Sequence, residues 1–341
     1  MFHLPSGIMP RERLTRVVAA LVWLAAAYAV CLPATVGVFV PASPPDPTER
    51  PDLDRTPAGD VWTPVYEGID LARWTVDVPL YRVYAARIDL RNPRLRHVAA
   101  ARNPRYLEGK RETRRQTTPA FLEENGLSFA INTNYYLPFN FWTVRFTGDA
   151  DLGGLAVAEG EVVSPPQEGF VSALFYNDGR DPEIRRLLPG DDVSDVWFAF
   201  SGRRRTLTDG VPCKASASSA RQPRSAVGFS RDRRYLYFLV IDGRQPGYSV
   251  GATLPEEGRE LLRCGAYDGF NLDGGGSSTM VIRGADGRGV VVNRPCNATW
   301  GRLRHNGNAF GIAAPGGLLA PVADGRRRPD RGRRSAEPGK K

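Results

Sequence analysis

The pattern of hydrophobic and polar positions predicts many short strands and few helices. Leu80–Leu90 and Arg94–Ala101 are predicted strands, and Tyr235–Ile241 (YLYFLVI) is apolar enough to be buried on both faces of a sheet. Further short strands are predicted at 127–132, 154–158, 172–177, 195–200, 225–230, 270–272, 279–282 and 308–313.

Two segments carry signals for the start of a helix. The first has Thr117 and Thr118 ahead of Pro119, so a hydroxyl group caps a first turn that contains proline. The second runs from Thr253 to about Gly265 and begins with a T-x-x-E capping box. Because strands dominate and helices do not alternate with them regularly, we expect an α+β fold. It would have mixed β-sheets and few helices in a single globular domain.

The two ends of the chain differ from this domain. Three arginines precede Val17–Val40, a run of 24 residues without charge, which predicts export with a cytoplasmic N-terminus. A retained membrane anchor and a signal cleaved near Ala42 are both open, because the run is long enough to span a bilayer. The predicted division is a basic stub with a signal or anchor (1–40), a Pro-rich linker (41–60), the domain (61–318) and a basic disordered tail (319–341).

Composition and charge limit the classes of partner. Of the 341 residues, 42% are hydrophobic and 24% are charged, which are ordinary values for a globular protein. The net charge is +9, but residues 321–341 contribute +5 of it, with eight Lys and Arg against three Asp and Glu. The basic balance therefore does not indicate a nucleic-acid-binding face. Attachment of the tail to an anionic polymer or to lipid headgroups is an alternative to a solvated tail.

Three cysteines fall within the predicted domain. Cys213 and Cys296 lie in loop-like sequence, and in an oxidising compartment they are the pair predicted to form a disulfide bond. Cys264 lies at a helix end beside apolar residues, which predicts a buried thiol.

Two aspartates follow predicted strands and are themselves followed by glycine. The segment NLDGGGSSTM begins at residue 271 and ends a strand in a carboxylate. Successive glycines suit a backbone that approaches a ligand closely and offers it N–H groups. A second Asp-Gly pair follows Tyr235–Ile241. The candidate residues from these two segments are Asp273, Gly274, Gly275, Gly276, Ser277, Ser278, Asp242, Gly243 and Arg244.

Other candidate residues lie at the ends of further predicted strands. Arg224 precedes an apolar strand, and its guanidinium suits a bidentate clamp on phosphate or carboxylate. Asn132 and Asn134 end another strand beside two tyrosines, and amides together with aromatic rings suit a sugar. Asn308 begins the last predicted strand.

These segments carry a family resemblance. INTNYY, GLAVAEGEVVSP, PRSAVGF, LVIDGRQPGYSVGATLPE, NLDGGGSSTM and NAFGI occur in this order. With them the chain resembles the phosphodiester glycosidase family, that of N-acetylglucosamine-1-phosphodiester α-N-acetylglucosaminidase, from roughly residue 80 to 315. The resemblance implies an extracytoplasmic hydrolase that releases the sugar from a sugar-1-phosphodiester. It also implies that Asn132, Arg224, Asp242, Gly243, Asp273, Gly274, Gly275, Gly276, Ser277 and Asn308 are pocket positions.

The chemistry of this reaction suggests roles for the candidate residues. Arg224 and the amides of Gly274–Gly276 would hold the phosphate. Asp273 or Asp242 would act as the nucleophile or as the base for water, and Asp273 is preferred because it adjoins the glycines. We expect no cofactor. An alternative is a divalent cation held by the two carboxylates with Asn and Ser oxygens.

The substrate expected from this reading is an anionic glycan or sugar phosphate of a cell wall or exopolysaccharide. Two other functions are open. One is a non-catalytic glycan-binding module of the cell envelope, and the other is a phosphodiesterase that breaks the other P–O bond.

Overall fold

The computed structural model describes residues 62–138, 148–177, 180–214, 220–297 and 302–326. The predicted signal or membrane segment 17–40, the linker 41–60 and the tail from residue 327 lie outside these ranges. Within them, no helix is long and apolar enough to cross a membrane.

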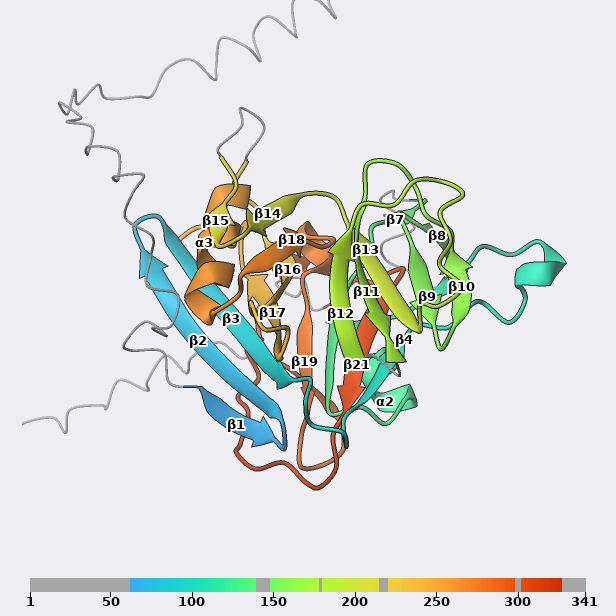
Figure 1. The fold of residues 1–341 in the computed structure, drawn as a ribbon. Coiled ribbons are helices and arrows are strands. Elements are labelled where there is room, and N and C mark those ends of the chain that lie inside the picture. The colour runs from blue at the N-terminus through green and yellow to red at the C-terminus, as the bar shows by residue number, and fades with distance from the viewer. Residues whose placement is uncertain (1–61, 139–147, 178–179, 215–219, 298–301, 327–341) are drawn as a thin grey trace, which may run out of the picture. The chain divides into compact units, whose positions relative to one another are not determined.

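Strands in four sheets are the main regular structure of the described chain (Figure 1). The largest sheet contains, in spatial order, β1 (Thr63–Tyr66), β2 (Ile69–Asp77), β3 (Leu80–Asp89), β17 (Tyr235–Ile241), β16 (Arg224–Phe229), β18 (Asp268–Asn271), β14 (Arg205–Thr208) and β15 (Val211–Pro212). A second contains β10 (Glu161–Ser164), β9 (Ala156–Ala158), β13 (Phe198–Gly202), β11 (Val171–Tyr176) and β12 (Arg180–Arg185). A third contains β20 (Gly289–Val291), β19 (Met280–Arg283), β6 (Phe129–Asn132), β21 (Ala309–Ala313) and β4 (Arg96–Ala99). The smallest contains β5 (Thr113–Arg115), β8 (Gly148–Leu152) and β7 (Tyr136–Leu137).

The predicted mixed sheets are wrong for the described chain, because each strand pairing there is antiparallel. The reason is visible in the largest sheet. A helix connects β17 to β18, as in a parallel crossover, but β16 lies between these two strands and pairs antiparallel with both. The α+β label therefore fits loosely, since the fold is mostly β, and a single domain stays a prediction.

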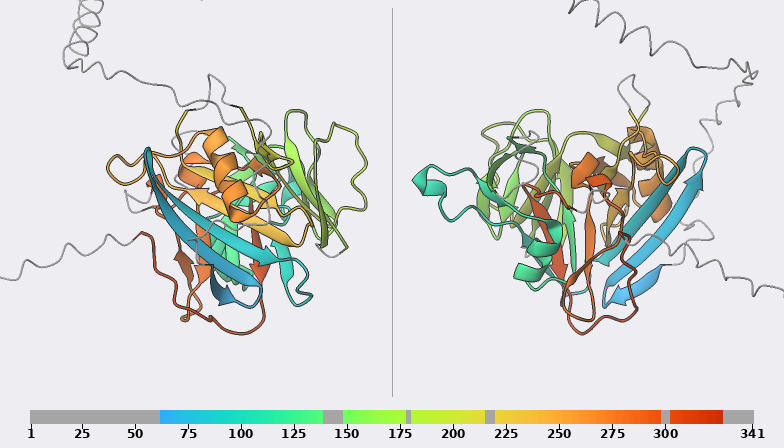
Figure 2. Two further views of the ribbon diagram at one scale, coloured as in Figure 1. Left: turned by 60° about the vertical axis from the view of Figure 1, so that its left-hand side comes forward. Right: turned by 180° about the vertical axis from the view of Figure 1, so that it is seen from behind.

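The described residues contain two α-helices, and both start as the sequence predicts. In α2 (Thr118–Glu124) the Thr117 hydroxyl accepts a hydrogen bond from the Ala120 amide at 3.3 Å. In α3 (Leu254–Cys264) both hydrogen bonds of the capping box form, and Gly265 ends the helix in the left-handed conformation. Figure 2 shows α3 lying across the largest sheet, whereas α2 packs beside the sheet of β6 and β21.

An aromatic core holds the three larger sheets together. The Phe310 ring of β21 lies 5.0 Å from the Phe200 ring, 5.7 Å from the Phe175 ring and 5.9 Å from the Phe238 ring, centroid to centroid. These rings come from all three sheets, and each is fully buried. Since such interiors are close-packed, the ends of the strands are fixed relative to one another.

The cysteines show one wrong prediction and one confirmed prediction. Neither Cys213 nor Cys296 forms a disulfide bond. Their surroundings differ, because Cys213 lies in the field of Glu257, while Cys296 lies in the field of Arg244. Cys264 is a buried thiol, as expected.

Candidate active site

Antiparallel pairing brings the candidate segments together where strands of two sheets end, and we call this side the edge of the two sheets. Arg224, the first residue of β16, lies opposite Ile241, the last residue of β17. Asn271 ends β18 at the same edge. In the neighbouring sheet Asn132 ends β6 opposite Ala309, which starts β21. The chain segments that follow or precede these residues are therefore close together, although they are far apart in sequence.

A cavity of about 710 Å³ opens at this edge, and we call it the Asp273 cavity. Its lining includes four arginines, two aspartates and three aromatic side chains. These are Arg203, Arg224, Arg244, Arg304, Asp151, Asp273, Tyr135, Tyr136 and Phe170. The excess of guanidinium groups over carboxylates suits an anionic ligand, and the aromatic rings suit the face of a sugar.

Asp273 is held rigidly at the wall of the cavity. Its backbone N–H donates to the Thr133 carbonyl at 2.8 Å, and its carbonyl accepts from the Asn132 amide at 2.6 Å. Burial raises the pKa of the Asp273 carboxyl to about 6, although a hydrogen bond with Ser277 and the nearby Arg304 guanidinium act in the opposite direction. A carboxyl with this pKa can change its charge near neutral pH, as catalytic acids and bases do.

The glycines after Asp273 allow close packing more than they offer free donors. A Cβ at Gly274 would lie 2.7 Å from the Pro223 carbonyl oxygen, and Gly275 has a φ of +66°. The Gly275 amide donates to that same carbonyl at 2.9 Å, so it is not available to a phosphate. A Cβ at Gly276 would lie 2.5 Å from the Arg304 guanidinium. The expectation that all three amides face a ligand therefore fails at Gly275.

Asn132 and Asn134 join segments of the protein and do not line the cavity. The Asn132 side-chain oxygen accepts from the Ser225 hydroxyl at 3.0 Å and from the Thr279 amide at 3.1 Å. Asn134 accepts at 2.8 Å from Asn308, whose side chain is also buried. These amides position the strand ends around the cavity, a role that the sequence alone did not distinguish from ligand binding.

Asp242 is a buried hydrogen-bond acceptor that lies outside the cavity lining. Its carboxylate accepts from the Arg294 backbone N–H at 2.9 Å, from the Asn293 amide at 2.9 Å and from the Tyr248 hydroxyl at 3.3 Å. Burial nevertheless raises the pKa of Asp242 to about 7. The next residue, Gly243, packs so tightly that a Cβ there would lie 2.6 Å from the Pro223 nitrogen. Asp242 thus fixes the chain around residues 293–294.

Two of the cavity arginines are held in place by backbone or side-chain acceptors. Arg224 donates to the Ala252 carbonyl at 2.9 Å and to the Ala220 carbonyl at 2.7 Å. Arg304 donates to the Ser277 hydroxyl at 3.2 Å. Arg244 is more exposed. Because acceptors already fix Arg224 and Arg304, a bound anion would restrict little additional side-chain motion.

The other candidates divide between these two environments. Ser277 is buried beside Asp273 and Arg304. Ser278 is buried as well, but its carbonyl accepts from the Asn293 amide at 3.1 Å and so lies on the Asp242 side.

Arg203 and Arg304 line the cavity but were missed in the sequence. Both lie in polar loop sequence that contains other arginines. No local motif there distinguishes an arginine of the cavity from one that faces solvent. Arg203 packs over the Phe170 ring at 5.2 Å, and Phe170 was not predicted as a site residue either. Only the position of Arg304 shortly before the NAFGI motif pointed toward the site.

The described residues give little support to the divalent-cation alternative. No group of three His, Cys, Asp or Glu side chains among them is arranged to hold a metal ion. The Asp242 carboxylate also accepts from N–H groups, so its oxygens already serve hydrogen-bond donors in place of a cation.

The fold and the cavity define a β-rich protein with a cavity lined by arginines and aromatic side chains. The family model for phosphodiester glycosidases (NAGPA) matches residues 125–329. The chain belongs to the phosphodiester glycosidase family. No curated protein matches its sequence.

Solved structures share this fold. The catalytic domain of zebrafish N-acetylglucosamine-1-phosphodiester α-N-acetylglucosaminidase, auto-inhibited by its pro-peptide, is similar with a TM-score of 0.54 and 18% identity, over 74% of this chain and 85% of that one. A hypothetical protein from Synechocystis gives a TM-score of 0.54 and 15% identity, over 73% of this chain. The chain spans only 62% of that protein's length. At these identities the likeness shows the fold alone.

Proposed function

We propose that this protein hydrolyses a sugar-1-phosphodiester between the anomeric carbon and the phosphate oxygen. The substrate would be a cell-wall or exopolysaccharide component outside the cytoplasm. The observation that carries the proposal is the placement of Asp273, with its raised pKa, in a cavity lined by four arginines and three aromatic side chains. The family membership and the fold support the same reaction class.

The arginines account for recognition of the phosphate. Arg224 and Arg304 are fixed by their own acceptors, and Arg244 lies at the same wall. Guanidinium groups bind phosphate oxygens through paired N–H donors and stabilise the charge that develops as the phosphate departs. Because a phosphate monoester is a good leaving group, a strong general acid is less necessary than for an ordinary glycoside.

Asp273 would act at the anomeric carbon. Above pH 6 its carboxyl is ionised, so it can serve as a nucleophile or as a base for water. The other carboxylate in the cavity lining, Asp151, forms an ion pair with Arg111. Asp242 would act indirectly, since its hydrogen bonds position the chain at residues 293–294.

Aromatic and amide side chains of the cavity lining would bind the sugar. Tyr135 offers a ring face, Phe170 adds a ring that also packs against the Arg203 guanidinium, and Gln167 adds an amide to the lining. The Tyr135 hydroxyl accepts from the Asn271 amide at 2.7 Å, so the ring is fixed before a ligand arrives. A ring held in this way loses little entropy on binding.

A nitrophenyl phosphodiester of N-acetylglucosamine tests the proposal. The wild-type protein should release free sugar and nitrophenyl phosphate, with oxygen from ¹⁸O-labelled water in the sugar. Asp273→Asn should lower kcat/KM by about 1,000-fold or more, a loss typical of a nucleophile or base. The matched control Asp286→Asn, in an exposed turn, should leave kcat/KM unchanged.

Other products would contradict the proposal in distinct ways. Sugar-1-phosphate together with nitrophenol would indicate a phosphodiesterase. Saturable binding of an anionic polysaccharide, with no product from any sugar phosphodiester, would indicate a binding module. Unchanged turnover in the Asp273→Asn variant would remove this residue from the mechanism.

A further inference from the structure

A second groove lies between the strands β2 and β3 and the C-terminal segment, away from the Asp273 cavity. We propose that it binds an anionic amphiphile, a molecule with one hydrocarbon chain and a charged phosphate or carboxylate head. The proposal does not depend on the proposed glycosidase activity, because the two sites share no lining residue.

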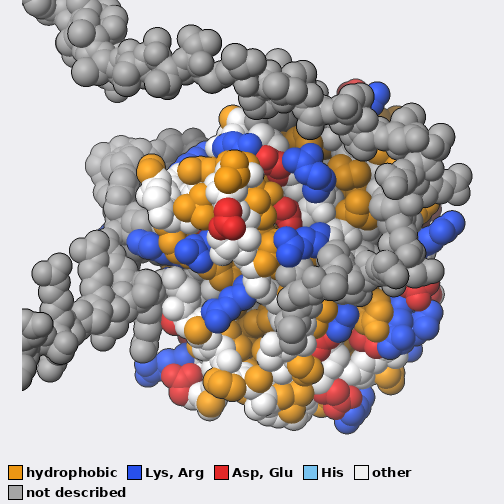
Figure 3. Space-filling view, turned by 90° about the vertical axis from the view of Figure 1, so that its left-hand side faces the viewer, with side chains coloured by type: hydrophobic (Ala, Val, Ile, Leu, Met, Phe, Trp, Pro, Cys, Tyr) orange, Lys and Arg blue, Asp and Glu red, His pale blue; other side chains and the backbone are white. Residues whose placement is uncertain are grey.

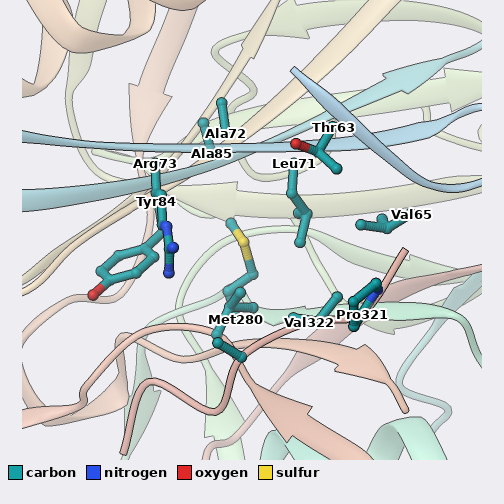
Figure 4. Close-up of a pocket in the computed structure, with 12 residues that line it drawn as sticks. Thr63, Val65, Leu71, Ala72, Arg73, Tyr84, Ala85, Met280, Pro321 and Val322 are labelled. Atoms are coloured by element: carbon teal, nitrogen blue, oxygen red, sulfur yellow. The ribbon is translucent and has the colours of Figure 1, made fainter. Parts of the chain in front are cut away.

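One half of the groove is an apolar cavity of about 400 Å³. Figure 4 shows Leu71, Met280 and Val322 around this space, with Val65 to one side and Arg73 and Tyr84 to the other. A volume of this size lies in the range of small-molecule sites, roughly 300–1,000 Å³. A hydrocarbon chain that lay against the apolar side chains of this lining would be partly removed from water.

The other half of the groove is cationic. An adjoining cavity of about 420 Å³ shares Arg73 and Tyr84 with the first and is also lined by Thr75 and Arg82. The strand register explains the change from an apolar to a cationic lining. Leu71, Arg73 and Thr75 are alternate residues of β2 and so share one face of the sheet. Arg73 pairs with Tyr84, and Thr75 pairs with Arg82, on β3. The groove therefore passes from apolar to basic along two strands.

The basic end has more positive charge than its neighbours neutralise. The Arg82 and Arg294 guanidinium groups each lie 4.7 Å from the Tyr248 ring centroid. Within the described part of the chain neither forms an ion pair with a carboxylate, and the buried Arg82 Nε has no hydrogen-bond partner. Asp242, the nearby acid, lines neither cavity, since it is buried behind Tyr248. Among the described residues the Arg82 guanidinium donates to the neutral Thr75 hydroxyl at 3.3 Å, and an anionic head would give Arg73 and Arg82 a charged acceptor.

The C-terminal segment closes one side of the groove. Pro321, Val322 and Ala323 form one wall of the apolar half, and the Gly325 amide donates to the Val291 carbonyl at 2.9 Å. On the side of the molecule that contains β1 and β2, Figure 3 also shows basic side chains next to hydrophobic ones. A neutral lipid would leave this charge unused, and free phosphate would leave the apolar half empty.

Calorimetry with the full chain tests the site. Dodecyl phosphate and dodecanoate, both below their micelle concentrations, should bind with Kd values at least about tenfold lower than those of dodecyl maltoside and inorganic phosphate. Equal affinity for dodecyl maltoside would refute the cationic end. Equal affinity for inorganic phosphate would refute the apolar half.

Variants distinguish the groove from the rest of the chain. Arg73→Gln combined with Arg82→Gln should weaken binding of dodecyl phosphate by about tenfold or more, because charge-assisted contacts are lost. Val322→Trp, which fills the apolar half, should weaken it similarly without lowering the unfolding temperature. Arg91→Gln, at an exposed ion pair with Asp232, is the control and should bind as the wild type does.

Each of these variants keeps the apolar run Val17–Val40. Any dodecyl phosphate that binds to this run therefore contributes equally to the variants and to the wild type. Wild-type affinity in the double arginine variant would overturn the proposal. Release of sugar by the Asp273 cavity should stay unchanged in each variant, so failure here is distinguishable from failure of the proposed function.

Discussion

Asp242 and Asp273 carry the same local sequence signature but lie in two different environments. Each follows a buried strand and precedes a glycine. The Asp242 carboxylate is surrounded by donors, two of which come from Asn293 and Arg294, about fifty residues downstream. The Asp273 carboxyl instead faces a cavity lined by arginines. A carboxylate that already accepts several N–H bonds holds structure, whereas one that faces an open cavity is available for chemistry.

Replacing each aspartate with asparagine should give opposite outcomes, and this is the largest expected effect. Asp273→Asn should lose activity by about 1,000-fold or more with little change in unfolding free energy. Asp242→Asn should unfold about 2 kcal/mol more easily, because the N–H donors around it lose a charged acceptor, and should keep kcat/KM within about tenfold. Urea denaturation measured together with kcat/KM checks both. A comparable loss of activity in a stably folded Asp242→Asn variant would contradict the division of roles.

Much of the fold was predictable because local signals decided it. The caps at Thr117 and Thr253 are sequence motifs that act within one turn, and the apolar run Tyr235–Ile241 needed only burial. In contrast, many of the shorter strands were not predicted, and neither were the longer strands β2 and β12. Their charged residues face solvent at the outer part of a sheet, so their pairing comes from neighbouring strands.

The site was predictable only in part. The glycine-rich segment located Asp273, because consecutive glycines need a structural reason. The structure supplies that reason as close packing against Pro223 and Arg304, where we had expected mainly ligand binding. Arg203 and Arg304 contribute charge through tertiary placement alone, which no spacing in the sequence encodes.

The fully buried carboxyl of Glu257 extends the comparison to a residue outside the cavity lining. Burial raises its pKa to about 8, although Arg224 and the Thr206 hydroxyl act in the opposite direction. In the unfolded chain a glutamate ionises near pH 4.3. Between these values the folded state binds one more proton than the unfolded state does, so stability falls as pH rises.

Relative to the wild type, Glu257→Gln should therefore gain about 4 kcal/mol of unfolding free energy between pH 5 and pH 9. Denaturation at both pH values measures this difference. If the Glu257→Gln variant were the less stable protein at pH 9, the ionised carboxylate would be a favourable partner of Arg224.

The smallest expected effect is a change in the pH dependence of kcat/KM, which distinguishes the role of Asp273 from that of Asp242. Burial raises the pKa of Asp273 to about 6, so kcat/KM should rise with pH to about 6 and then level off. Below that value it should fall about tenfold per unit, because the protonated carboxyl is neither a nucleophile nor a base.

The Ser277→Ala variant should move this limb to higher pH, because it removes a hydrogen bond that stabilises the Asp273 carboxylate. Asp242→Asn should leave the limb in place, although the pKa of Asp242 is also raised, to about 7. Initial rates at low substrate concentration between pH 4.5 and 8 would measure both shifts. A limb that disappeared in Asp242→Asn would assign the titration to Asp242, and a rate that fell above pH 6 would make the group a proton donor.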